Sequence, residues 1–128
     1  MRPFVTDAMI VRDGRIVLIR RKNEPFKGKW ALPGGFAEAD ETAEQCCARE
    51  ALEETGLSVR VKKLIGVFSG PDRDPRGTVA AAYLCEAVGG ELKGGDDAKE
   101  AKWFPLKELP ELGFDHEKII EEGKKLIR

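Results

Sequence analysis

Few groups in this 128-residue chain can bind zinc or act as a thiol or imidazole catalyst. The sequence has one histidine, His116, and three cysteines, Cys46, Cys47 and Cys85, whose odd number and spacing do not fit a zinc site. We therefore expect buried, reduced cysteines and no structural zinc. His116 begins a helical pattern, where we expect a capping or surface residue rather than part of a nucleophilic Cys–His or Ser–His system.

The sequence also lacks an excess of one charge and any long apolar run. With 22 basic and 23 acidic residues its formal net charge is −1, which argues against broad electrostatic attraction to nucleic acid or membranes. Its longest wholly apolar run, Val79 to Cys85, covers seven residues, whereas a spanning helix needs about 20. Because no secretory signal pattern opens the chain, we expect a cytoplasmic protein.

Enough apolar residues are present to build a core, because 41% of the chain is hydrophobic. At this length we expect a single domain, residues 1–128. Val5 to Arg12 and Arg15 to Arg21 are β-type runs joined by Asp13-Gly14, which predicts a hairpin. Beyond the loop that follows, Pro33-Gly34-Gly35 is expected to continue neither a strand nor a helix.

The rest of the chain alternates between the two kinds of secondary structure. Helices are predicted from Thr42 to Thr55, ended by Gly56, and after a cap at Asp115; strands are predicted at Val59 to Phe68, Thr78 to Val88 and Ala101 to Phe104. This order predicts an α/β protein in which a mixed β-sheet is sandwiched between helices.

The first predicted helix carries three glutamates on one face, Glu50, Glu53 and Glu54. Their separations of three and four residues place them within about 100° of arc. On the opposite side we expect an apolar stripe of Ala48, Ala51 and Leu52 to dock on the sheet. The three carboxylates are therefore expected to point outward, into a cleft or solvent.

Such an acidic face is unfavourable in isolation, because each like-charged pair at this spacing costs about 0.2 to 0.5 kcal/mol. A divalent cation would reverse that sign, since carboxylate oxygens suit Mg²⁺ or Mn²⁺ and Mg²⁺ completes its shell with water and substrate phosphate. The alternative is a solvated acidic face with Arg49 and nearby lysines as counterions.

The stretch from Gly35 to Leu57 resembles the Nudix box, Gly-x5-Glu-x7-Arg-Glu-U-x-Glu-Glu-x-Gly-U, where U is a bulky aliphatic residue. The matching positions are Gly35, Glu41, Arg49, Glu50, Glu53, Glu54, Gly56 and Leu57. Ala51 departs from the pattern, which prefers a larger aliphatic residue there. Trp30-Ala-Leu-Pro-Gly-Gly35 and the flanking strands also resemble this family, so the likeness extends over most of the chain.

The resemblance implies a Nudix-like α/β/α sandwich and a Mg²⁺-dependent pyrophosphohydrolase, with Mn²⁺ as an alternative metal. The implied metal ligands are Glu50, Glu53, Glu54 and the carbonyl of Gly34. Arg49 would orient those carboxylates, and Glu41 would help to fix the loop to the helix. For the general base, Glu53 competes with Asp96, Asp97 and Glu100 in the later loop.

The loop from Gly70 to Gly77 looks like that of the ADP-ribose pyrophosphatase branch. Arg73 and Arg76 are expected to hang over the cleft edge and contact the diphosphate or the terminal ribose, because guanidinium groups match phosphate oxygens. Pairing with Asp72 and Asp74 in a solvated turn is the alternative.

Further substrate contacts are expected from aromatic and basic residues. Phe26, Trp30 and Trp103 are candidates for base stacking, with core packing as the alternative. Positive potential near the substrate could come from Arg20, Arg21, Lys27 and Lys29, with a solvated basic edge as the alternative.

The function expected is hydrolysis of ADP-ribose, a small-molecule partner, to AMP and ribose 5-phosphate. The alternatives are a house-cleaning pyrophosphohydrolase of oxidised or non-standard nucleoside triphosphates and a non-catalytic nucleotide-sensing module. Nucleic acid and membranes are not expected partners, and a homodimer is one option for assembly.

Overall fold

The computed structural model describes residues 1–95 and 98–127 and is built on a seven-stranded sheet. Five strands follow the order β3-β2-β1-β6-β5, while β4 pairs with β1 and β7 pairs with β2. The strands are β1 (Phe4–Arg12), β2 (Arg15–Arg21), β3 (Trp30–Ala31), β4 (Gly34–Phe36), β5 (Leu57–Phe68), β6 (Val79–Gly90) and β7 (Ala98–Pro105), and the helices are α1 (Ala43–Thr55) and α2 (His116–Lys124).

The predicted hairpin is confirmed. β1 and β2 are antiparallel, with Arg12 opposite Arg15, and the turn residues Asp13 and Gly14 have φ values of 50° and 75°. Positive φ at both central positions is typical of a tight turn whose twist matches that of the strands. No helix in the described part of the chain is long and apolar enough to cross a membrane.

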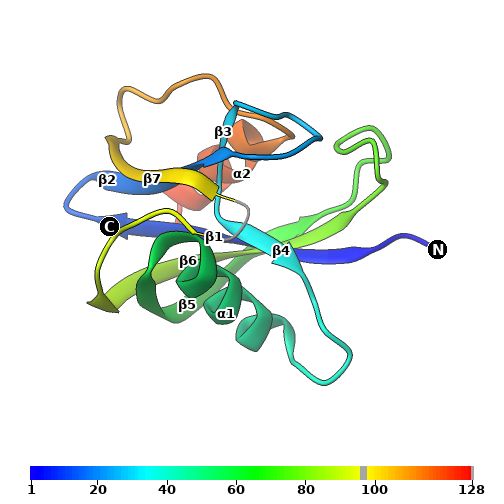
Figure 1. Ribbon diagram of the computed structural model, residues 1–128, viewed down its shortest axis with the longest axis horizontal. Coiled ribbons are helices and arrows are strands. Elements are labelled where there is room, and N and C mark those ends of the chain that lie inside the picture. Colours follow the sequence, from blue (N-terminus) through cyan, green and yellow to red (C-terminus); the bar gives the residue numbers. More distant parts are fainter. Residues whose placement is uncertain (96–97, 128) are drawn as a thin grey trace.

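The two central strands, β1 and β6, run parallel and are buried on both faces (Figure 1). Ala8 and Ile10 of β1 pack in the cluster that includes α1, whereas Met9 packs in the cluster that includes Ile119 and Ile120 of α2. This period of two shows that the helices cover opposite faces of the sheet. The predicted α/β/α sandwich is therefore confirmed.

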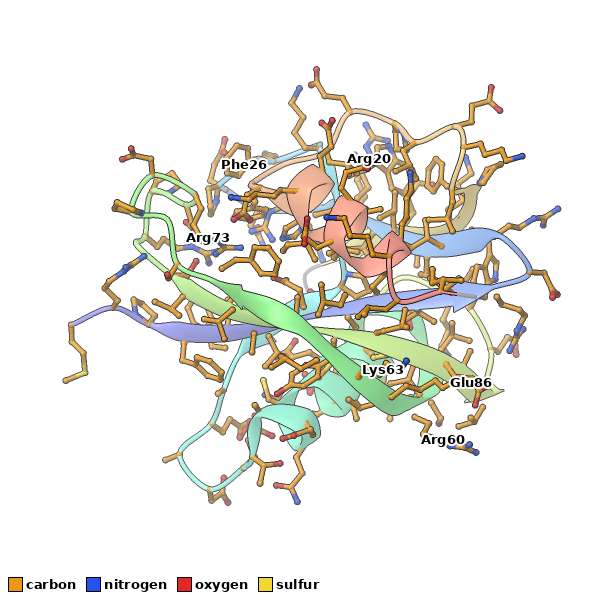
Figure 2. All side chains as sticks on the ribbon, turned by 180° about the vertical axis from the view of Figure 1, so that it is seen from behind. Arg20, Phe26, Arg60, Lys63, Arg73 and Glu86 are labelled. Atoms are coloured by element: carbon orange, nitrogen blue, oxygen red, sulfur yellow. The ribbon has the colours of Figure 1, made fainter. Side chains whose placement is uncertain are left out.

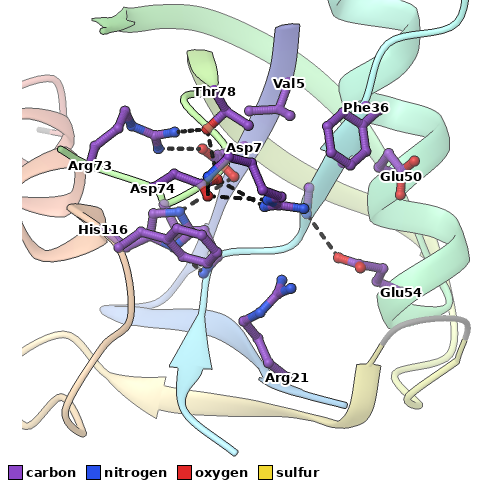
Figure 3. A pocket seen from close by; sticks show the side chains of 15 residues that line it. Val5, Asp7, Arg21, Phe36, Glu50, Glu54, Arg73, Asp74, Thr78 and His116 are labelled. Atoms are coloured by element: carbon purple, nitrogen blue, oxygen red, sulfur yellow. Dashed lines mark hydrogen bonds and ion pairs between the residues drawn. The ribbon is translucent and has the colours of Figure 1, made fainter. Parts of the chain in front are cut away.

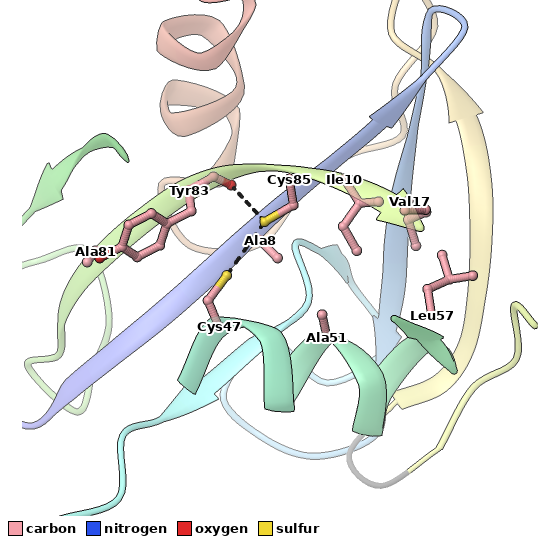
Figure 4. Packing of buried hydrophobic residues seen from close by; sticks show 10 residues of the cluster. Ala8, Ile10, Val17, Cys47, Ala51, Leu57, Ala81, Tyr83 and Cys85 are labelled. Carbon is pink, nitrogen blue, oxygen red and sulfur yellow. Dashed lines mark hydrogen bonds between the residues drawn. The ribbon is translucent and has the colours of Figure 1, made fainter. Parts of the chain in front are cut away.

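Helix α1 begins and ends as its sequence predicts. Thr42 and Gln45 form a capping box, and Gly56 adopts the left-handed conformation with φ of 76° after the last turn. The predicted apolar stripe is wrong in one part, because Leu52 is 49% exposed. Cys47 and Ala51, one turn apart, face the sheet instead (Figure 4). The three cysteines are buried and unbridged, as expected.

Two short strands, β3 and β4, were not expected. Gly34 to Phe36 form β4, which pairs antiparallel with Val5 to Asp7 of β1. The absence of a side chain at Gly34 permits this pairing, because a Cβ there would collide with the backbone carbonyl of Thr6. The expectation that the Pro33-Gly34-Gly35 segment continues no strand is therefore wrong, and the pairing brings this segment beside α1.

Candidate active site

A cavity of about 130 Å³ lies between α1, the start of β1, β4, the loop 69–78 and the start of α2 (Figure 3). Its wall on the α1 side carries Glu50 and Glu54 beside Gly34 and Gly35. The rest of the lining consists mainly of charged and aromatic side chains. These are Asp7, Arg21, Phe36, Arg73, Asp74, Arg76, Phe114 and His116.

Exposure differs among the three clustered glutamates of α1, Glu50, Glu53 and Glu54. The side chains of Glu50 and Glu53 are 13% and 38% exposed, whereas Glu54 is 3% exposed as a residue and its Oε1 accepts a hydrogen bond of 2.8 Å from the Gly34 N–H. Glu54 is not exposed to open solvent, but it lines the cavity, which agrees with the expectation that the carboxylates point into a cleft or solvent. Its bond to Gly34 ties α1 to β4, at the edge of the cavity.

The guanidinium group of Arg49 forms hydrogen bonds with several neighbouring carboxylates. It donates to Glu41 at 2.7 Å, to Glu50 at 2.9 Å and to Glu53 at 3.1 Å. A fourth bond, to the Phe36 carbonyl, joins α1 to the end of β4. The hydrogen bond from Arg49 lowers the pKa of Glu41 to about 2, so that carboxylate stays charged at neutral pH.

The donor set on this wall fits a divalent cation. Glu50, Glu53 and Glu54 offer only oxygen atoms, which are the ligands that Mg²⁺ and Mn²⁺ prefer. Gly35 leaves room for them, because a Cβ at Gly35 would lie within 2.6 Å of both oxygens of the Glu50 carboxylate. Among residues 1–95 and 98–127, no three acidic, histidine or cysteine side chains already form a metal-ligand cluster. Arg49 supplies the positive charge between Glu50 and Glu53.

The loop 69–78 places Arg73 inside the molecule rather than over the cleft edge. Its side chain is 3% exposed, and it donates to both oxygens of Asp115, at 2.9 and 3.0 Å, and to the hydroxyl of Thr78. The expectation that Arg73 overhangs the cleft is wrong, because these partners from α2 and β6 draw the guanidinium inward. Asp115 correspondingly bonds Arg73 and makes no side-chain cap on α2.

Arg76 stays partly exposed at the cavity, with 36% of its side chain accessible. It pairs with Asp74 at 2.9 Å and lies 5.0 Å from the ring centre of Phe36 and 5.9 Å from that of Phe114. Burial raises the pKa of Asp74, but hydrogen bonds from Arg76 and Thr78 outweigh burial and hold that pKa below its usual value. Arg76 therefore presents a cation to the cavity.

The cavity lining does not include three other residues that the sequence suggested for the site, Arg20, Phe26 and Glu100. Arg20 of β2 pairs with Glu100 of β7 at 3.4 Å, and Phe26 packs against Phe114 at a ring distance of 4.6 Å (Figure 2). A register shift between Arg20 and Arg21 accompanies this arrangement, and Arg21 lines the cavity instead. Asp96 and Asp97, the alternatives for the general base, lie outside the described residues.

The two tryptophans considered for base stacking also lie outside the cavity. Trp30 contacts Phe104 at a ring distance of 4.8 Å, and the Arg12 guanidinium lies 5.5 Å from the ring centre of Trp103. These contacts show that both tryptophans pack against other side chains, which was the alternative to base stacking. Phe36 and Phe114 provide the aromatic lining of the cavity.

Two cavity residues were missed or misjudged from the sequence. Asp7 is the one charged residue between Val5 and Val11, and an acid inside an apolar strand is a signal that could have identified it. His116 was expected to be a capping or surface residue, but it is 3% exposed and its Nδ1 accepts a hydrogen bond of 2.9 Å from the Leu32 N–H. Tertiary packing, which its position at a helix start does not reveal, explains this difference.

Sequence comparisons place the whole of this site within one known domain type. Residues 1–123 match the profile described as the NUDIX domain. The chain is 57% identical over 117 residues to an ADP-ribose pyrophosphatase of Methanocaldococcus jannaschii, with 91% of this chain and 69% of that protein covered.

Solved structures give the same result for the fold. A bifunctional NMN adenylyltransferase/ADP ribose pyrophosphatase of Francisella tularensis, complexed with AMP and a Mn ion, superposes with a TM-score of 0.88 at 31% identity; 98% of this chain but only 42% of that chain is covered. The NUDIX domain of Shewanella oneidensis NrtR, complexed with ADP ribose, gives 0.85 at 27% identity, with 100% and 90% covered.

Proposed function

Because the chain belongs to the NUDIX domain family, we propose that it hydrolyses ADP-ribose at its diphosphate, giving AMP and ribose 5-phosphate. One observation carries this proposal: the carboxylates of Glu50 and Glu54 and the side chains of Arg21 and Arg76 line the same cavity. A diphosphate needs both, since its oxygens bind a metal ion on one side and guanidinium groups on the other. The similarity to the M. jannaschii protein supports ADP-ribose as the substrate.

Mg²⁺, with Mn²⁺ as the alternative, would be held by Glu50, Glu53 and Glu54, with the carbonyl of Gly34 as a further ligand. When bound, such an ion neutralises phosphate oxygens and lowers the pKa of a coordinated water. The F. tularensis protein was solved with a Mn ion, which supports a divalent metal here. Arg49 orients the carboxylates, because it donates to both Glu50 and Glu53.

Glu53 is the residue that we propose as general base. Among Glu50, Glu53 and Glu54 it is the most exposed, so water can reach its carboxylate. Glu100 remains the described alternative, but its carboxylate is paired with Arg20. A general base must lie within hydrogen-bond reach of the attacking water. Glu53 is itself paired with Arg49 at 3.1 Å, but it lies on the same helix face as the proposed ligands Glu50 and Glu54 and therefore close to a water bound there.

Arg76 and Arg21 are proposed to bind the diphosphate, whereas Arg73 holds the loop that carries Arg76. Arg76 is partly exposed and anchored by Asp74, so its guanidinium is already positioned when substrate arrives. Such preorganisation lowers the entropic cost of binding. Arg20 and Phe26 then act indirectly, through Glu100 of β7 and through Phe114 at the cavity.

A substrate panel tests the proposal. The purified chain is assayed with Mg²⁺ on ADP-ribose, NADH, diadenosine polyphosphates, sugar nucleotides and oxidised dGTP, and kcat/KM is compared. The proposal predicts the highest kcat/KM for ADP-ribose. A higher value for oxidised dGTP or another triphosphate would replace it with the house-cleaning function, and binding of ADP-ribose without hydrolysis of any compound would indicate a sensor.

A further inference from the structure

Asp7 of β1 is a buried acid whose hydrogen bonding is incomplete. The residue is 6% exposed and lines the cavity, and its Oδ2 has no hydrogen-bond partner among the described residues. The nearest basic groups are Nη2 of Arg73, 3.8 Å from Oδ2, and Nε2 of His116, 3.6 Å from Oδ1. Charged N–H···O hydrogen bonds are normally about 2.7 to 2.9 Å long, so both contacts are too long.

The donors near Asp7 are held back by other partners. Arg73 uses all three of its guanidinium nitrogens on Asp115 and Thr78. Nδ1 of His116 accepts a hydrogen bond from the Leu32 N–H, so a neutral ring carries its proton on Nε2, the nitrogen that faces Asp7. The fold therefore brings donors close to Asp7 without letting them complete its hydrogen bonding, although an unpaired buried carboxylate oxygen is unfavourable.

The space over this carboxylate is kept open by Gly34. A Cβ at Gly34 would lie 2.6 Å from Oδ1 of Asp7, so any side chain there would cover the acid. Figure 3 shows Asp7 among Arg73, Asp74 and His116 at the cavity. Oδ2 is itself covered, so an atom of a ligand in the cavity approaches the Asp7 carboxylate beside Oδ1, where Gly34 carries no side chain.

The charge of Asp7 restricts what that ligand atom can be. A carboxylate repels phosphate and accepts hydrogen bonds, so the diphosphate must lie away from it, toward Arg21, Arg76 and the α1 glutamates. The cavity of about 130 Å³ is smaller than the roughly 300 Å³ of a typical complete ligand site, so its enclosed part takes one portion of a nucleotide. Near Asp7 the aromatic lining comes from Phe114, whose ring stacks on that of His116 at 4.9 Å, and such a surface suits a nucleoside.

We infer that Asp7 is a specificity-determining residue that accepts a hydrogen bond from a neutral N–H or O–H donor of the nucleoside half of the substrate. The donor is the exocyclic amine of the base or a ribose hydroxyl. This inference rests on the proposed nucleotide hydrolase function, but it makes a separate claim about which portion of the nucleotide enters the cavity. A nucleotide without the donor leaves Asp7 unsatisfied and binds more weakly.

Calorimetric titration with AMP tests the inference without requiring hydrolysis. AMP is compared with three analogues that each lack one donor: purine riboside 5′-monophosphate, 2′-deoxy-AMP and 3′-deoxy-AMP. The wild-type chain should bind one of them about 10- to 100-fold more weakly than AMP, the range expected when a hydrogen bond to a charged group is lost. The identity of the weakened analogue tells the base amine from the ribose hydroxyls.

Two matched variants assign the discrimination to Asp7. In Asp7→Asn the difference between AMP and the weakened analogue should fall to less than about threefold, because the charged acceptor is gone. In Asp115→Asn, which removes the carboxylate on the other side of Arg73, the difference should persist. If Asp7→Asn does not fold by circular dichroism, Asp7→Ser takes its place.

Several results would overturn the inference. These are equal binding of AMP and all three analogues, no measurable binding of AMP, discrimination that survives in the Asp7 variant, and discrimination that is lost equally in Asp115→Asn. The hydrolysis assay is read separately. A chain that discriminates through Asp7 but does not cleave ADP-ribose retains this inference and loses the proposed function, and the converse result loses only the inference.

Discussion

Two clusters of acids and arginines lie beside the cavity, and they differ in charge balance and in burial. Around Arg49, four carboxylates lie within 4 Å of one guanidinium, those of Glu38, Glu41, Glu50 and Glu53. We call this the helix cluster. Around Arg73, the loop cluster contains Asp7 and Asp115, and Arg76 pairs with Asp74 beside it.

The loop cluster is more deeply buried than the helix cluster. Arg73 is 3% exposed in its side chain, compared with 27% for Arg49. An accessible excess of carboxylates can take up a metal ion with little rearrangement, but buried and nearly matched charges hold a loop in place and are strongly destabilised when one partner is removed. The comparison teaches that acid and arginine content alone does not distinguish a ligand site from a scaffold; exposure and charge balance do.

The largest effect is expected in the loop cluster. Arg73→Ala should lower the free energy of unfolding by about 3 to 5 kcal/mol, because it leaves the largely buried Asp115 without its guanidinium partner and removes the buried positive charge beside Asp7. Urea denaturation measures this. Arg60→Ala is the control, since Arg60 pairs with Glu86 on the surface with 68% of its side chain exposed and should cost about 1 kcal/mol or less (Figure 2). Equal midpoints for the two variants would contradict the assignment of Arg73 as a scaffold residue.

The helix cluster should show the opposite behaviour, with a loss of activity and no loss of stability. Glu53→Gln is expected to lower kcat for ADP-ribose by about a hundredfold or more, because the proposed base and metal ligand is lost. Its unfolding midpoint should be unchanged or higher, since like-charge repulsion on α1 is relieved. Glu44→Gln, in the first turn of the same helix, is the matched control. Wild-type turnover in Glu53→Gln would contradict the proposed catalytic role of the helix cluster.

Substitutions of Arg76, at the boundary between the two clusters, test whether this residue binds substrate. Arg76→Ala should raise KM for ADP-ribose by about tenfold and change kcat less, because an arginine that contacts the ground state and the transition state equally contributes uniform binding. Arg76→Lys, which keeps the charge but not the planar guanidinium, should fall between the variant and the wild type. A variant with unchanged KM would show that Arg76 only neutralises Asp74.

The smallest effect is a difference in acid stability. The pKa of folded Asp74 lies below its usual value of 3.8, so the unfolded chain takes up this proton at a higher pH than the folded chain. The stabilisation from Asp74 is present above pH 3.8 and is lost as pH falls through the lower folded pKa. Unfolding free energy should therefore decline less steeply below about pH 5 in Asp74→Asn than in the wild type. Identical slopes would contradict this assignment.

Local patterns predicted most of the fold. Asp13-Gly14 marked the hairpin, Thr42 and Gly56 marked the ends of α1, and the acidic spacing marked the helix cluster. These signals depend on neighbours in sequence, where turn and capping preferences act.

The contacts within the loop cluster could not be predicted from the sequence, because its members come from segments far apart in the chain. Arg73 points inward because it donates hydrogen bonds to Asp115 and Thr78 in the interior. Asp7 and His116 come close together only when β1 and α2 pack. Likewise, Arg21 rather than Arg20 lines the cavity beside a strand irregularity that strand periodicity does not reveal.

The most direct test of the central claim is the cleavage of ADP-ribose by the wild-type chain with Mg²⁺, with Mn²⁺ and with a chelator, followed by separation of the products. The account predicts equal amounts of AMP and ribose 5-phosphate with either metal and no products in chelator. An undiminished rate in chelator, or intact ADP-ribose in the presence of both metals, would contradict it.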